Sequence, residues 1–99
     1  MVVDAIALHS TDNVATTVQD LVPGQTAMVR LNRDVLQVVI QEKIPYGHKF
    51  ALRFIPKGQE ILKYGEVIGR ATADIQSGCH AHVQNIESLR GRGDLPKEG

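Results

Sequence analysis

The sequence predicts a single all-β domain. Short runs of alternating apolar and polar residues are typical of half-buried strands. Turn residues separate these runs, which is typical of a fold built from many short strands. With 99 residues, 42% of them hydrophobic, the chain can form one modest core and no second domain.

One turn pattern recurs along the chain: an apolar residue, then two residues that are often proline or polar, then glycine. Its four copies are residues 21–24, 44–47, 55–58 and 75–78. Proline restricts one turn dihedral and glycine supplies the left-handed one, so each copy should reverse the chain before a strand. The irregular spacing of the copies argues against a solenoid.

Seven strands are expected from the alternating runs. They are residues 2–8, 26–31, 35–41, 49–53, 60–63, 67–72 and 79–84. In the third of them, Leu36, Val38 and Ile40 share one face while Gln37 and Gln41 share the other. This pattern is that of a strand with one buried face.

One short helix is expected at residues 13–20. Val14, Val18 and Leu21 recur at helical spacing behind a Thr-Asp pair that can cap the first turn. The domain should therefore occupy residues 1–88, with one short helix among its strands. Residues 89–99 are polar and predict a mobile tail that could order against a partner.

Charge and composition narrow the class of protein. Eleven basic and eleven acidic side chains cancel, so the field that attracts nucleic acid or an anionic membrane is missing. No apolar run approaches the roughly 20 residues that span a bilayer. The single cysteine, Cys79, cannot form an internal disulfide, which suits a reducing cytoplasm. We expect a cytoplasmic protein that binds neither nucleic acid nor membrane.

His80 and His82 are the most informative side chains. Their spacing puts both imidazoles on one face of the predicted strand, where they can converge on a metal ion or an anionic substrate. Hydrogen-bonded surface histidines are the ordinary alternative. Zinc sites use three or four protein ligands, so a metal would need more from His9, His48 or another chain. Cys79, on the opposite face, is expected to be a small buried residue.

Two other groups of residues could contribute to a site. His9, Asp12 and Asn13 lie at the predicted strand-to-helix junction, where they bring together an imidazole, a carboxylate and an amide; alternatively, Asp12 and Asn13 only cap the helix. His48-Lys49 and Lys63-Tyr64 adjoin glycines that let a substrate approach the backbone. Solvated lysines and a turn tyrosine are the alternative there.

Five motifs, in order, resemble the SAF domain of the altronate/galactarate dehydratase family. They are residues 8–15, 47–52, 63–65, 68–72 and 78–85, so the resemblance runs from about residue 5 to about residue 90. In that family the domain either begins a longer dehydratase or forms a separate small subunit, as in sulfolactate sulfo-lyase. Because this chain ends soon after the domain, we expect the stand-alone small subunit.

The resemblance implies a β-clip fold and a lyase that eliminates water from a sugar acid such as altronate or galactarate. It implies a large catalytic subunit as partner and no activity of this chain alone. It also implies a divalent metal, Fe(II) or Mn(II), for which the large subunit could supply most of the ligands. Elimination of sulfite from sulfolactate is an alternative. Two further alternatives are a non-catalytic carbohydrate-binding or scaffold module and a metal-responsive regulatory subunit. The chain could also form a homo-oligomer.

The resemblance also implies the site residues. His9, His80 and His82 would be catalytic, and the last two would also bind metal. The substrate-binding residues would be Asp12, Asn13, His48, Lys49, Lys63, Tyr64 and Asn85, although Asp12 and Asn13 are better suited to holding the first loop. The sequence departs from the family at Gln84, where a third histidine is usual; an amide cannot take up a proton as an imidazole does.

Overall fold

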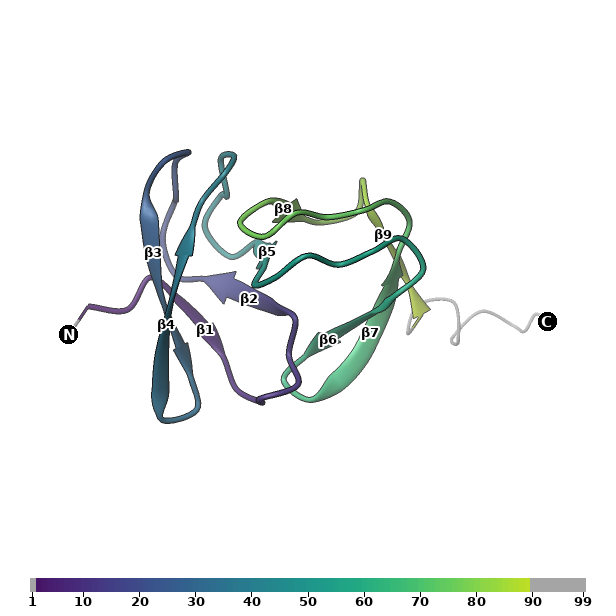
Figure 1. Ribbon diagram of the computed structural model, residues 1–99, viewed down its shortest axis with the longest axis horizontal. Helices are drawn as coiled ribbons and strands as arrows, with labels where there is room; N and C mark the ends of the chain where they lie inside the picture. Colours follow the sequence, from purple (N-terminus) through teal and green to yellow (C-terminus); the bar gives the residue numbers. More distant parts are fainter. Residues whose placement is uncertain (1, 90–99) are drawn as a thin grey trace.

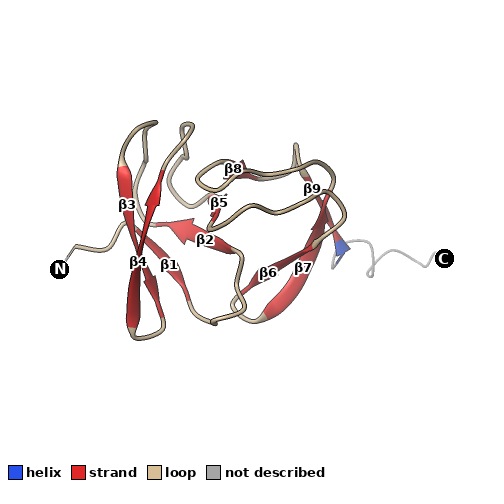
Figure 2. Ribbon diagram, in the orientation of Figure 1, coloured by secondary structure: helices blue, strands red, loops and turns tan. Residues whose placement is uncertain are grey.

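Residues 2–89 are described by the computed structural model, and they form nine β-strands in two sheets (Figure 1). Helical backbone within this range is confined to Leu89, so strands and loops make up the fold (Figure 2). The strands are β1 (Ala5–Ala7), β2 (Val14–Thr17), β3 (Thr26–Leu31), β4 (Asp34–Val39), β5 (Lys49–Ala51), β6 (Glu60–Lys63), β7 (Glu66–Ala71), β8 (His80–Ala81) and β9 (Ile86–Ser88). The predicted all-β class is confirmed.

The larger sheet has the strand order β4-β3-β1-β2-β5-β8, and the smaller has the order β6-β7-β9. All pairs are antiparallel except β1 with β3. In Figure 1, β3 and β4 lie at one end of the domain and the smaller sheet at the other, with β5 and β8 between them. Each end has its own apolar cluster, and the fully buried Phe50 belongs to the cluster of the larger sheet.

The predicted helix at residues 13–20 is wrong, because residues Val14–Thr17 form β2. This strand lies between β1 and β5 and buries Val14, Ala15 and Thr17. The β-branched valine and threonines favour extended backbone. Hydrogen bonding to strands on both sides then outweighs the helical spacing of the apolar residues. Val18, which a helix would have turned toward the core, is 44% exposed.

Several strand boundaries also differ from the predicted ones. The predicted strand at 79–84 is reduced to β8, so His82 lies in the turn that follows the strand. Strand β9 was missed because its sequence is short and mixed in polarity. The predicted tail, apart from Leu89, lies outside the described residues. Within residues 2–89, no helix is long and apolar enough to cross a membrane.

The four repeated turns have the conformation that their sequences predict. Their glycines all have positive φ: +88° at Gly24, +82° at Gly47, +92° at Gly58 and +83° at Gly78. Their apolar residues pair two by two through reciprocal backbone hydrogen bonds, Leu21 with Ile44 and Ile55 with Ile75. The Leu21–Ile44 pair lies in the core of the larger sheet, and the Ile55–Ile75 pair in the second cluster.

Asp12 and Asn13 connect the two sheets. The buried Asp12 carboxylate accepts hydrogen bonds from four backbone N–H groups, two in its own loop and those of Tyr64 and Gly65 in the β6–β7 turn. The Asn13 amide donates to the carbonyl of Glu60 and accepts from the N–H of Leu62. We call these two residues the clamp, because they satisfy backbone groups of β6 and its turn from the β1–β2 loop.

A glycine substitution tests the packing of the turns. A Cβ at Gly78 would overlap the carbonyl oxygen of Val39, whereas a Cβ at Gly24 would meet nothing within 4 Å. Both positions carry the left-handed penalty of roughly 1–2 kcal/mol. Gly78→Ala should therefore lower the free energy of unfolding clearly more than Gly24→Ala does, as measured by urea denaturation. Equal losses would contradict the close approach at Gly78.

The clamp predicts a pH-dependent stability. Burial raises the pKa of the Asp12 carboxyl, but its four N–H donors outweigh burial and hold the pKa below the usual value. The charged carboxylate thus stabilises the fold above about pH 4, and this contribution is lost as the pH falls through the lower folded pKa. Asp12→Asn should cost about 2–3 kcal/mol at pH 7, because an amide group must face an N–H donor.

Urea denaturation at several pH values checks this, with Asp74→Asn as the matched control. Asp74 is exposed and accepts one backbone N–H, from Lys57, which an asparagine can still satisfy. The difference between wild type and Asp12→Asn should narrow below about pH 4. A difference that stays constant down to pH 3, or that equals the loss in Asp74→Asn, would refute the clamp.

Candidate metal and substrate site

Three imidazoles come together where β5 meets β8. His48 follows the turn glycine Gly47 and precedes β5, while His80 begins β8. The register pairs Lys49 with Ala81 and Phe50 with His80. Continued by one residue, this register brings His48 opposite His82. Antiparallel pairing therefore gathers side chains that are more than thirty positions apart in the sequence.

The three rings of His48, His80 and His82 form a compact stack, called here the histidine cluster. Ring centroids lie 4.2 Å apart for His48 and His82, 5.1 Å for His48 and His80, and 5.2 Å for His80 and His82. One nitrogen from each ring lies within 4.8 Å of the others. The expected common face of His80 and His82 is present. His48 joins them; it was expected as a substrate-binding residue and, with His9, as a source of further ligands.

Two imidazoles of the cluster, those of His80 and His82, favour the neutral form. Burial lowers the pKa of His80 and of His82, and the neighbouring His48 lowers both further. The Nδ1 atom of His82 is buried and has no hydrogen-bond partner. Neutral imidazole is the form that ligates metals. Because His82 Nδ1 has no hydrogen-bond partner, this nitrogen is available to bind a ligand. The donor set therefore fits a divalent metal ion.

Gln84 acts on the cluster through His80. Its amide nitrogen lies 3.1 Å from His80 Nδ1, within hydrogen-bond distance. His80 Nε2 lies 2.8 Å from His48 Nδ1, so one of these two nitrogens carries a proton and donates it to the other. Gln84 thus orients the ring of His80 through Nδ1, which is the part that an amide can play where the family usually has an imidazole.

Asn85 holds the turn that carries His82. Its side-chain oxygen accepts the backbone N–H of His82, and its amide nitrogen donates to the carbonyl of His80. Its own N–H donates to the carbonyl of His82. The structure thus uses Asn85, expected as a substrate-binding residue, to position the two histidines.

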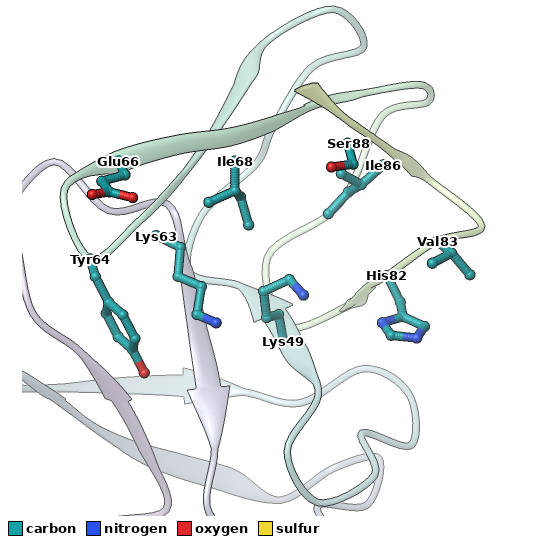
Figure 3. A pocket seen from close by; sticks show the side chains of 9 residues that line it. All are labelled: Lys49, Lys63, Tyr64, Glu66, Ile68, His82, Val83, Ile86 and Ser88. Atoms are coloured by element: carbon teal, nitrogen blue, oxygen red, sulfur yellow. The ribbon is translucent and has the colours of Figure 1, made fainter. Parts of the chain in front are cut away.

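A cleft of about 470 Å³ opens beside the histidine cluster (Figure 3). It is lined by Lys49, Lys63, Tyr64, Glu66, Ile68, His82, Val83, Ile86 and Ser88. His82 belongs to both the cluster and the cleft, so the two are continuous. Of the substrate-binding residues expected from the sequence, the cleft gathers Lys49, Lys63 and Tyr64.

The two lysines give the cleft a positive character. Burial lowers the pKa of Lys49, and the charge of Lys63 lowers it further. The ammonium of Lys63 lies 5.1 Å from the centre of the Tyr64 ring, at cation–π distance. In Figure 3 both ammonium groups extend into the space between β5 and the β6–β7 hairpin.

The first motif lies elsewhere. His9 packs against the β6–β7 turn, where a Cβ at Gly65 would lie 3.0 Å from its ring, and its Nδ1 is 3.0 Å from the hydroxyl of Thr11. It is not among the described residues that form the histidine cluster. The helix N-terminus expected to support this group is absent, and the clamp uses the polar atoms of Asp12 and Asn13 internally.

Cys79 contributes no ligand to the cluster. Its side chain is half-buried against the second apolar cluster, as expected for the opposite face of the strand. Burial raises the pKa of its thiol, and the charge of Glu42 raises it further, so the thiolate that metals prefer is disfavoured.

The fold and the histidine cluster define a small β-domain with imidazoles at one edge and a cationic cleft. The family model for the altronate/galactarate dehydratase SAF domain matches residues 3–89, so the chain belongs to this family.

Its relatives include proteins of two lengths. The chain is 42% identical to altronate dehydratase of Escherichia coli over 83 residues, which are 84% of this chain and 16% of that protein. It is 48% identical to galactarate dehydratase (L-threo-forming) of the same organism over 73 residues, 74% of this chain and 13% of that protein. It is 33% identical to (2R)-sulfolactate sulfo-lyase subunit alpha of Chromohalobacter salexigens over 93 residues, 91% of this chain and 99% of that subunit.

Proposed function

We propose that this chain is the small subunit of a metal-dependent lyase that eliminates water from a sugar acid, together with a separate large catalytic subunit. The observation that carries the proposal is the histidine cluster beside a cationic cleft, in a domain related to two sugar-acid dehydratases. The match to nearly the whole of a protein that is itself a subunit supports the two-chain arrangement. A reducing cytoplasm is the compartment that suits the chemistry and the single cysteine.

His48, His80 and His82 would hold the metal, Fe(II) or Mn(II). Imidazole is a suitable ligand for both ions, and further positions would be left for oxygen ligands of the substrate or the large subunit. When bound, such an ion supplies Lewis acidity toward the carboxylate and hydroxyl oxygens of the acid. Gln84 and Asn85 would orient the rings, as outer hydrogen-bond partners do in metal sites.

The lysines would prepare the acid for elimination. The reaction removes the proton alpha to the carboxylate and breaks the bond between the β-carbon and its hydroxyl, so water leaves and an enol remains. The enol then tautomerises to a 2-keto-3-deoxy acid. Removing the alpha proton adds negative charge to the substrate, which the ammonium group of Lys49, the neighbour of His48 in the chain, would stabilise. The base itself would come from the large subunit or from an imidazole of this chain.

Sulfolactate is the second candidate substrate, because the full-length match is to a sulfo-lyase subunit. Loss of its alpha proton and of sulfite from the β-carbon leaves enolpyruvate, which tautomerises to pyruvate. The same carboxylate and metal contacts would serve both reactions. The products distinguish them, since one reaction releases sulfite and the other water.

Metal binding by the chain can be measured directly. Calorimetric titration of the 99-residue chain with Mn²⁺ should give one site per chain. His82→Ala should weaken it by at least about tenfold, since even outer-sphere partners of metal ligands contribute that much. His9→Ala is the control, because His9 lies outside the cluster and the variant should bind as the wild type does. Unchanged Mn²⁺ affinity in His82→Ala, or equal losses of affinity in both variants, would contradict metal binding at the histidine cluster.

Activity should require two chains. The chain should co-purify with the product of a neighbouring reading frame for a large dehydratase subunit. The complex, with Fe(II) or Mn(II), should convert one acid from a panel of hexonates, aldarates and sulfolactate. His82→Ala should lower kcat of the complex by about a hundredfold or more, whereas Lys57→Met, in a turn away from the cleft, should leave it unchanged.

Three outcomes would contradict the proposal. Enzyme-like turnover by this chain alone would contradict the two-subunit arrangement. Unchanged turnover in His82→Ala would remove this residue from the active site. A chain with no partner and no turnover would favour a non-catalytic carbohydrate-binding module instead.

A further inference from the structure

Lys49 and Lys63 are two half-buried cations that share one cleft. Among the contacts of residues 2–89, neither ammonium forms an ion pair with a carboxylate; Lys63 lies over the Tyr64 ring, and the charge acting on Lys49 is that of Lys63. Two like charges in a partly desolvated cleft repel each other. An anion between them would convert this repulsion into two attractions.

Lys49 cannot easily move away from this position. It begins β5, which is paired on one side with β2 and on the other with β8. Lys63 ends β6, whose turn is held by the clamp. Both lysines therefore extend from backbone that is fixed by hydrogen bonds, unlike lysines on exposed loops, which separate freely in solvent.

The same cleft has a second place for an acid group. His82 lines it and belongs to the histidine cluster, the proposed metal site. Apolar side chains, Ile68, Val83 and Ile86, line the space as well, and Figure 3 shows the lysines and His82 around one opening. Glu66 also lines the cleft but has an interaction of its own, and in Figure 3 it lies at the edge remote from His82.

We propose that the cleft binds a dianionic acid, with one acid group at the histidine cluster and the other between Lys49 and Lys63. The inference rests on the proposed function, because it specifies the class of acid that the lyase takes. Aldarates, with a carboxylate at each end, and sulfo-hydroxy acids, with a carboxylate and a sulfonate, belong to this class. Hexonates, which carry a single carboxylate, do not. A cleft of about 470 Å³ is of the size that holds small ligands.

A pair of matched ligands tests the inference on the chain itself. Galactarate and galactonate are linear six-carbon acids with the same configuration at the hydroxyl carbons that they share, and they differ in having two carboxylates and one. Each is titrated into the 99-residue chain loaded with diamagnetic Zn²⁺, an ion that takes imidazole ligands, while backbone amide shifts are followed by NMR. Galactarate should bind roughly tenfold more tightly than galactonate, because its second carboxylate gains charge-assisted contacts with the lysines. The shifts should centre on Lys49, Lys63 and His82.

Variants assign the preference to the lysine pair. Lys63→Met should bind the two acids with nearly equal affinity, and its spectrum reports directly whether it is folded. Lys57→Met, which removes an exposed lysine outside the cleft, should keep the preference for galactarate. Equal binding of the two acids by the wild type, a preference that survives in Lys63→Met, or the absence of saturable shifts with either acid would overturn the inference.

This result is independent of turnover. A chain that prefers galactarate in a complex that dehydrates no acid would refute the proposed lyase and leave the dianion site standing. A complex that dehydrates a hexonate well, with a chain that does not distinguish the two acids, would support the proposed lyase and refute the dianion site.

Discussion

The pairing of four glycine turns is the constraint on which the rest of the structure depends. Leu21 bonds reciprocally with Ile44, and Ile55 with Ile75, so each core is closed by two turns that hydrogen-bond to each other. One turn of each pair also leads directly to histidine residues: Gly47 precedes His48, and Gly78 stands two residues before His80. Because β5 and β8 begin at these turns and pair with each other, the histidine cluster lies where the two halves of the domain meet.

Most polar residues of the motifs hold the backbone around the histidine cluster and the cleft through hydrogen bonds. The clamp ties the β6–β7 turn, and with it Lys63 and Tyr64, to the larger sheet. Asn85 fixes the turn of His82, and Gln84 hydrogen-bonds to the ring of His80. The groups left to meet a ligand are the imidazoles and two lysines. In the proposed lyase, the small domain would present a preorganised half of the active site to the large subunit.

Much of this was predictable from local sequence, and the rest depends on pairing. The four turns, the buried face of β4 and the common face of His80 and His82 follow from residue types and spacing. Strand β2 was mistaken for a helix because Val14, Val18 and Leu21 fit a helical period, and only its position between two strands decides the outcome. That His48 belongs with His80 and His82 follows from the register of β5 with β8, a contact between distant segments that no local pattern reports.

The most direct test of the metal site is a crystal structure of the 99-residue chain grown with Mn²⁺, with anomalous data collected to locate the metal. We expect an anomalous peak bound by nitrogen atoms of His48, His80 and His82, beside the cleft that Lys49 and Lys63 line. A peak bound by other residues, or well-ordered imidazoles without one, would contradict the claim that the meeting of β5 and β8 creates a metal site.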